Sequence, residues 1–167
     1  MFIKKSNYLQ IFIGVVALCI GTLVYLASRS PEATYFVSQL PPFLSLHGRW
    51  PDLFGPAHKS LASFLHVFSF SMMTAGIAAE SKTGLFAVCF GWAVVNLGFE
   101  LGQYFDDRVV KHLPAWFEHY PLLETVDDYF TAGCFDGWDI AAIFAGSAAA
   151  YVVGTILEHE GFVPFVG

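Results

Sequence analysis

Four apolar stretches, each long enough to cross a bilayer, restrict what this chain can fold into. A helix needs roughly 20 mostly apolar residues to span the hydrocarbon core of a membrane. The stretches cover residues 9–27, 61–79, 84–105 and 134–157. They predict an all-α, polytopic membrane protein in which four transmembrane helices form a bundle. The chain is then a single domain, 1–167, with long loops at 28–60 and 106–133.

The composition excludes several classes of protein. Apolar residues make up 56% of the chain and charged residues 13%, whereas an ordinary soluble domain carries about 25% charged residues. The net charge of −6 provides no basic face for a phosphate backbone, so no nucleic-acid partner is expected. The three cysteines are an odd number, which is not typical of a disulfide framework. Membrane lipids are the expected surroundings.

The first span begins like a signal peptide, because Lys4 and Lys5 precede it. Its apolar stretch is longer than the core of a signal peptide, which is about 7–15 residues, so we expect it to be retained. The two lysines favour a cytoplasmic N-terminus. Four spans then put the C-terminus in the cytoplasm and both long loops outside. These loops carry more basic residues than the inner segments, but they are longer and also acidic. The expected location is the inner (plasma) membrane.

Polar side chains interrupt the spans near one end of the expected bundle. Residues 80–83 form a short link, so the second and third spans form a helical hairpin and successive spans alternate in direction. This alternation places five polar residues at the outer end: His66, Glu100, Gln103, Asp136 and Asp139. An ionisable residue at the centre of a span costs about 2.5–3.5 kcal/mol on insertion scales, so such residues are functional candidates. Asn96 joins Glu100 and Gln103 at i, i+4 and i+7, which is one stripe of a helix.

Small residues mark two expected helix-packing seams. Gly98-x-x-x-Gly102 in the third span has the spacing that lets a second helix approach closely. The fourth span has Ala142, Gly146 and Ala150 on one line. These seams predict that the last three spans meet around a polar pocket.

Several of the polar residues also have purely structural interpretations. His66 can be a hydrogen-bonded core residue. Asp136 can cap the start of the fourth span, where the helix dipole favours a carboxylate. Arg108, just beyond the third span, can anchor it at the interface, or it can pair with Glu100 or Asp139.

Several of these residues together resemble the VanZ-like integral membrane proteins. The similar features are Phe-Leu-His-Val-Phe at 64–68, Glu100-x-x-Gln103 followed five residues later by Arg108, and Asp139 with Gly146 after it. The resemblance covers residues 61–154. It implies a small multi-span envelope protein, since some members are linked to glycopeptide (teicoplanin) resistance and others to polysaccharide or cell-surface functions. It does not imply a particular reaction.

The sequence also departs from the family pattern. The acidic motif follows closely after the arginine in the family, whereas 27 residues separate Arg108 from Asp136 here. The family often has an asparagine after its aspartate in the fourth span, where this chain has Ala142 and Ile143. Asn96 is the residue that can supply such an amide instead.

Two main functions fit these patterns. In the first, an envelope protein acts on or binds a lipid-linked or glycopeptide-type ligand. Glu100, Asp139 and His66 are then the acid/base or metal-binding groups, and Gln103, Arg108, Asp136 and Asn96 bind the ligand. Arg108, Lys111 and His112 are suited to a phosphate. In the second, the chain is a non-catalytic accessory subunit of a larger respiratory, photosynthetic or secretion complex.

Two further interpretations stay open. His66 can be the axial ligand of a haem or chlorophyll-type pigment, and intramembrane carboxylates can mark a path for ions. The polar groups do not reach the inner half of the membrane, so no complete path is visible. No catalytic signature such as H-E-x-x-H or G-x-S-x-G occurs. Enzymatic activity, metal and cofactor are therefore left undecided.

Overall fold

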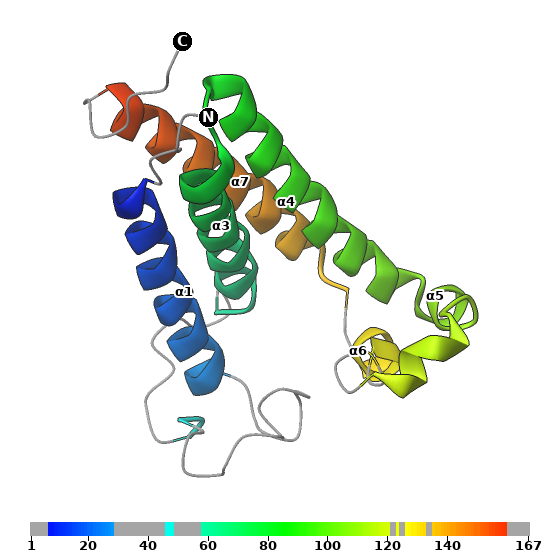
Figure 1. Cartoon of the computed structure of the whole chain (residues 1–167). Helices are drawn as coiled ribbons and strands as arrows, with labels where there is room; N and C mark the ends of the chain where they lie inside the picture. The colour runs from blue at the N-terminus through cyan, green and yellow to red at the C-terminus, as the bar shows by residue number, and fades with distance from the viewer. Residues whose placement is uncertain are drawn as a thin grey trace.

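The computed structural model describes residues 7–28, 46–48, 58–120, 123, 126–132 and 135–159, and these residues are mostly helical with no strand among them. Four helices are long: α1 (Tyr8–Ser28), α3 (His58–Ala78), α4 (Lys82–Tyr104) and α7 (Gly137–His159). Three are short: α5 (Asp106–Val110), the 3₁₀ helix η4 (Ala115–His119) and α6 (Val126–Ala132) (Figure 1).

The four predicted spans are confirmed, because all four long helices are long and apolar enough to cross a membrane. Their ends lie within three residues of the predicted ends, including the start of the fourth span. That span was expected to begin at Cys134, which lies outside the described residues, and α7 begins at Gly137. Most of the loop at 28–60 also lies outside the described residues.

The helices alternate in direction as the hairpin requires. The turn between α3 and α4 is short, and the Ser81 hydroxyl caps α4 by accepting a hydrogen bond from the Gly84 N–H at 3.1 Å. At this hairpin end the start of α1 meets the end of α3, since the Asn7 N–H donates to the Gly76 carbonyl at 2.8 Å. The end of α7 lies there too. We call the opposite end, where α4 passes into α5 and α7 begins, the loop end.

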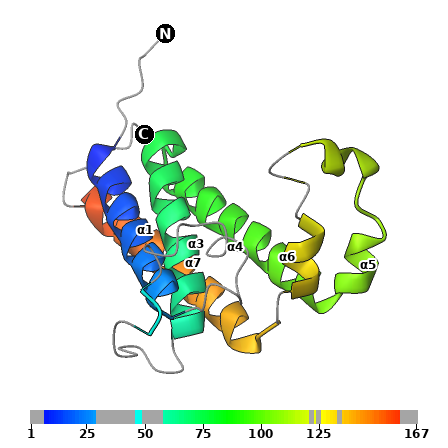
Figure 2. The ribbon, with the colours of Figure 1, turned by 90° about the horizontal axis from the view of Figure 1, so that it is seen from below.

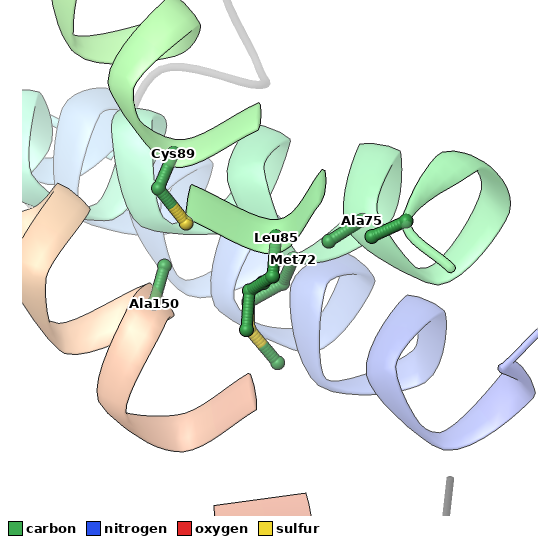
Figure 3. Close-up of a cluster of buried hydrophobic side chains, with 6 residues drawn as sticks. Met72, Ala75, Leu85, Cys89 and Ala150 are labelled. Carbon is green, nitrogen blue, oxygen red and sulfur yellow. The ribbon is translucent and has the colours of Figure 1, made fainter. Parts of the chain in front are cut away.

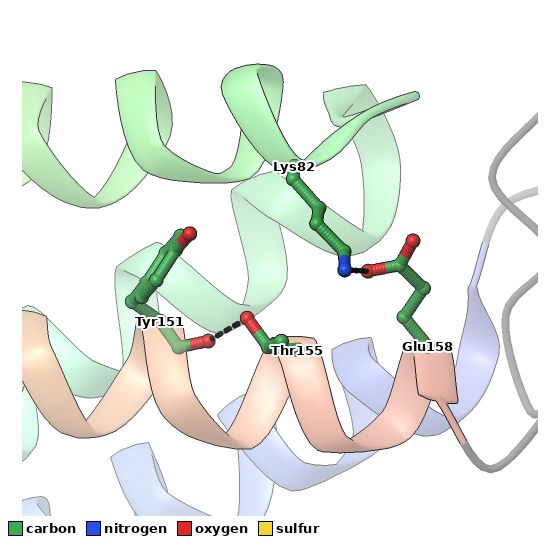
Figure 4. Close-up of polar contacts among 4 residues, drawn as sticks. All are labelled: Lys82, Tyr151, Thr155 and Glu158. Atoms are coloured by element: carbon green, nitrogen blue, oxygen red, sulfur yellow. Dashed lines mark hydrogen bonds and ion pairs between the residues drawn. The ribbon is translucent and has the colours of Figure 1, made fainter. Parts of the chain in front are cut away.

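An ion pair joins α4 and α7 at the hairpin end. Figure 4 shows Lys82 reaching from the first turn of α4 toward Glu158 in the last turn of α7, with Nζ 3.8 Å from Oε2. The lysine side chain is 62% exposed, so the pair is worth at most about 1 kcal/mol. The pair shows that α4 and α7 are antiparallel, because the start of α4 lies beside the end of α7.

The core lies around α3, which packs against α1, α4 and α7. Met72 and Ala75 of α3 meet Leu85 and Cys89 of α4 and Ala150 of α7 in one buried cluster (Figure 3). Apolar side chains gain little by leaving lipid for another helix, so such a bundle is held by close packing.

Glycines provide the closest approaches between the long helices. A Cβ at Gly146 of α7 would lie 2.5 Å from the Phe64 carbonyl oxygen of α3, which confirms the predicted seam in the fourth span. A Cβ at Gly14 of α1 would lie 2.8 Å from the Ser69 carbonyl oxygen. This second seam, between α1 and α3, was not predicted.

At the other predicted seam, Gly98 does not pack against a described helix of this chain, since a Cβ there would have no described atom within 4 Å of it. Gly102, its partner in the motif, packs against Phe130 of the short helix α6 and not against a long helix. Phe130 also stacks on Phe99, with ring centroids 6.3 Å apart. The segment 106–133, expected to be a loop, therefore contains helices that fold back on the end of α4. Figure 2 shows α5 and α6 to one side of the four-helix bundle.

The outward faces of α1, α4 and α7 are apolar, whereas α3 exposes one large apolar side chain, Ile77, among its described residues. The exposed residues include Phe12, Val15, Ile20, Leu23, Phe86, Phe90, Val94, Phe144, Val152 and Ile156. A soluble protein rarely exposes so continuous an apolar surface. With four helices of spanning length, the chain is a multi-pass membrane protein.

Candidate functional site

Asp136 caps the start of α7. One of its carboxylate oxygens, Oδ1, accepts a hydrogen bond from the Trp138 N–H at 3.0 Å. A carboxylate in this position satisfies one of the free N–H groups at the beginning of a helix. The structural interpretation of Asp136 therefore has direct support from its geometry.

Asp139 lies one turn further along α7, and its surroundings differ from those of Asp136. The residue is 6% exposed, and its Oδ1 atom is buried without a hydrogen-bond partner among the described residues. The first turn of a helix favours a negative charge. That field does not replace a donor, however, because a buried oxygen without one costs about 1–3 kcal/mol or more for a charged group. The sequence showed two acidic residues three apart, and the structure separates a capping carboxylate from a buried one.

His66 lies on the outside of α3 and contacts aromatic rings. Its ring centroid is 4.6 Å from that of Phe70, and Phe70 in turn stacks on Trp92 of α4 at 4.7 Å. The Trp92 indole N–H donates to the Thr74 hydroxyl at 2.9 Å. The imidazole is exposed, so His66 is not the enclosed core residue that one interpretation expected.

Asn96 approaches the same pair of rings from α4. Its side-chain amide donates to the Trp92 carbonyl of its own helix at 2.8 Å. His66 lies one turn from Phe70, and Asn96 one turn from Trp92, both toward the loop end. Because Phe70 and Trp92 face each other, His66 and Asn96 lie at the same depth.

A small buried cluster fixes the depth of Asp139 relative to these two residues. Val67, Ala93 and Ile143 pack together from α3, α4 and α7. His66 precedes Val67, whereas Asn96 and Asp139 each lie about one turn from the cluster toward the loop end. The structure thus brings three of the predicted residues, from three helices, to neighbouring depths.

Glu100 and Gln103 continue the stripe of α4 toward the loop end. Both are half-buried, and Glu100 interacts with its surroundings. Because α4 and α7 are antiparallel, the Glu100 level of α4 corresponds to the beginning of α7. The predicted gathering of polar groups near this end is therefore consistent with the register of the two helices.

Arg108 lies apart from these carboxylates. Its guanidinium carbon is 5.8 Å from the centroid of the Phe105 ring, and the side chain is exposed. Among the described residues no ion pair joins Arg108 to Glu100 or Asp139. Arg108 instead lines an open hollow of about 530 Å³ together with His112 and three apolar side chains. Of the two interpretations of Arg108, the described residues do not contain the ion pair with Glu100 or Asp139, and an exposed side chain beyond the end of α4 fits an interfacial anchor.

Gln10 is a buried polar residue to which sequence analysis gave no role. It is 1% exposed, its Oε1 accepts from the Asn7 amide at 2.7 Å, and its Nε2 is buried without a described partner. A Cβ at Gly154 of α7 would lie 2.9 Å from that nitrogen. The available signal was a single amide in an otherwise apolar span. Gln10 joins α1 to α7 at the hairpin end, far along the helices from Asp139.

The described residues contain no group of three or more His, Cys, Asp or Glu side chains placed to hold a metal ion. Cys19 and Cys89 are free thiols. Glu100, Asp139 and His66 remain candidates for acid/base chemistry as separate groups. The structure describes them as neighbours in depth and not as a coordination shell.

Comparisons give no further guide to the function: no protein-family model matches the chain, and neither a curated protein nor a solved structure is significantly similar to it.

Proposed function

We propose that the chain is a VanZ-like protein of the cell envelope that binds a lipid-linked or glycopeptide-type ligand at the loop end of its bundle. The observation that carries the proposal is the buried Asp139 carboxylate, whose Oδ1 has no hydrogen-bond donor among the described residues. A buried acceptor of this kind is unfavourable in the free protein. A ligand that brings its own donor removes the cost.

The chemistry of the ligand follows from what Asp139 needs. Hydroxyl, amide and ammonium groups all donate hydrogen bonds to a carboxylate, and such bonds are the stronger ones because one partner is charged. Saccharide and peptide head groups are rich in these donors. The apolar outer faces of α4 and α7 are exposed and would adjoin lipid in a membrane, so a head group carried on a lipid can approach from the bilayer.

The other polar residues of the loop end complete the proposed site. Glu100 and Gln103 offer further acceptors and donors along α4. His66 and Asn96 lie about one helical turn from Glu100, toward the middle of the bundle. Glu100, Asp139 and His66 can each exchange a proton, so they are the groups on which any reaction of the bound ligand would depend. Asp136 and Arg108 are not part of this set, because Asp136 caps α7 and Arg108 points to a separate hollow.

The proposed orientation places this site on the outer side of the plasma membrane. Lys4 and Lys5 precede α1, and basic residues beside a first span favour the cytoplasm. The hairpin end, with Lys82, would then be cytoplasmic, and the loop end would face the cell wall or periplasm, where glycopeptide-type ligands occur.

Replacing Asp139 with Asn is expected to reduce the stabilisation by ligand strongly. The probe is a polyprenyl-diphosphate-linked disaccharide-peptide, added to the full chain in detergent, and the measurement is the change in Tm. At a ligand concentration near 100 Kd, binding stabilises the wild type by about 2.7 kcal/mol. The Asp139→Asn variant should show less than a third of the wild-type shift, because the neutral amide oxygen of asparagine is a weaker acceptor than the charged carboxylate.

The matched control is Asp136→Asn, which removes one negative charge from the same helix end. Asparagine caps helices about as well as aspartate, so this variant should keep both its basal Tm and the full ligand shift. Equal shifts in the wild type and in Asp139→Asn would contradict the proposed site. A wild type that shows no shift would contradict the proposed ligand class.

A second candidate function has one observation in its favour. Gly91 and Gly98 on α4 have no described atom within 4 Å of where a Cβ would lie. Small residues in a span typically allow a second helix to approach closely, so this open face suits an accessory subunit held in a larger membrane complex. The mass of the particle extracted from native membranes separates the two functions.

A further inference from the structure

One face of the short helix α5 combines apolar and basic side chains and has no covering element among the described residues. Phe105, Arg108, Val109, His112 and Leu113 line an open hollow of about 530 Å³. Arg108 and Val109 belong to α5, Phe105 precedes it, and His112 and Leu113 lie in the turns that follow it, where their N–H groups donate to the Val109 and Val110 carbonyls. The lining therefore consists of two basic side chains, Arg108 and His112, among three apolar ones.

The two basic side chains are held in place by contacts within the segment. The Arg108 guanidinium lies over the Phe105 ring, 5.8 Å from its centroid, a contact that orients the cation. The His112 Nδ1 is 2.7 Å from the Arg108 carbonyl, and because a carbonyl only accepts, Nδ1 is the donor. The second ring nitrogen, Nε2, can then donate a hydrogen bond to an anionic ligand beside the guanidinium when the ring is in its imidazolium form.

The neighbouring charged side chains of this segment do not line the hollow. Asp107 lies about half a helical turn from the hollow, and Asp106 Oδ1 is engaged by the Asp107 N–H at 2.6 Å. Lys111, the residue after α5, is exposed but does not line the hollow. The face therefore presents positive charge next to apolar surface.

The hollow lies at the expected level of the lipid head groups. α5 begins two residues after α4 ends, so it lies just beyond a membrane-spanning helix. Tyr104 is 60% exposed, Phe105 44% and Trp116 54%, and exposed aromatic residues at the ends of spans are typical of the membrane interface. Acyl chains and head groups are both within reach of such a position.

We propose that this face binds an anionic phospholipid, with its phosphate on Arg108 and His112 and its acyl chains along Phe105, Val109 and Leu113. Guanidinium groups bind phosphate oxygens through charge-assisted hydrogen bonds. The apolar side chains of the lining can contact the acyl chains of a lipid, whereas a free phosphate has no apolar part to contact them. The site goes beyond the proposed function, because it uses none of the polar residues around Asp139.

Binding of phosphatidylglycerol to the full chain in a neutral detergent tests the site, with bound lipid counted by native mass spectrometry over a titration. Arg108→Gln should weaken phosphatidylglycerol binding about tenfold, a change within the range of a hydrogen bond to a charged group. His112→Gln should weaken it less, and the double variant most. Phosphatidylcholine should bind weakly to all variants alike.

Lys111→Gln is the matched control, because it removes a neighbouring positive charge that does not line the hollow. This variant should change binding by less than about twofold, as expected for an exposed charge acting at a distance. Equal losses in Arg108→Gln and Lys111→Gln would overturn the site in favour of diffuse attraction. Unchanged binding in Arg108→Gln, or competition by inorganic phosphate as effective as by the lipid, would overturn it as well.

Failure of this site is distinguishable from failure of the proposed function. Asp139→Asn should keep phosphatidylglycerol binding, and Arg108→Gln should keep the Tm shift caused by the polyprenyl-linked probe. Because Arg108 is exposed and joins no described ion pair, Arg108→Gln should also keep the helical circular dichroism of the wild type.

Discussion

Replacing Gly146 with alanine is expected to destabilise the bundle by about 1–3 kcal/mol, the usual cost of overpacking, or by more. The added Cβ would lie 2.5 Å from the Phe64 carbonyl oxygen, and Phe64 Cα and C would both lie 3.3 Å away. These are backbone atoms, so no side-chain rotation relieves the clash. α3 and α7 have to move apart, and because α3 is the central helix its contacts with α1 and α4 are disturbed as well.

The measurement is the loss of helical circular dichroism as a denaturing detergent is titrated into micelles that contain the protein. Gly98→Ala is the matched control, since it is the same substitution in a spanning helix, at a position with open space around it. Alanine favours a helix over glycine by about 0.8–1 kcal/mol, so Gly98→Ala should be neutral or stabilising. Similar behaviour of the two variants would mean that α3 and α7 do not meet at Gly146.

Replacing Val94 with arginine is expected to impair insertion of α4 into the membrane. Val94 is 50% exposed and lies next to Ala93, the midpoint of α4. An arginine at the centre of a span costs about 2.5–3.5 kcal/mol on insertion scales. α4 already carries the polar residues Asn96, Glu100 and Gln103, which make its insertion less favourable. A further charge therefore has a large effect on its insertion.

Insertion is measured by glycosylation mapping in microsomes, with acceptor sites placed on either side of α4. Thr83→Arg is the control, because it adds the same charge in the first turn of the helix, where a long side chain reaches the interface. The control should insert as the wild type does. If Val94→Arg inserts as efficiently as Thr83→Arg, the exposed face of α4 does not lie in lipid.

The spanning helices could be predicted because a bilayer requires a certain length and apolar composition of each helix. Both properties can be recognised in a single sequence. The hairpin between α3 and α4 followed from a link too short for any other path, and alternation of the spans placed the polar residues at one end. The seam at Gly146 was also predictable, since small residues in a spanning helix have few other uses.

Features that depend on contacts between distant segments were not predictable in the same way. Nothing local indicates that Phe130 packs against Gly102, so both the helices within 106–133 and the open space at Gly98 were missed. Asp136 and Asp139 have the same side chain at the start of one helix, and only the packing of α7 shows that one caps it while the other is buried. Arg108 was close in sequence to Glu100, but the turn at Phe105 directs it to a different face.

Native mass spectrometry of the untagged chain, extracted from its native membranes in a mild detergent, tests the central claim most directly. The claim is that this four-helix bundle is itself a binding protein, with its ligand at the loop end. The predicted result is a monomer or dimer that carries a bound lipid-linked molecule, which is lost when Asp139 is replaced by Asn. A stoichiometric place in a much larger assembly, with no such molecule bound, would contradict it and would make the polar residues a packing feature of an accessory subunit.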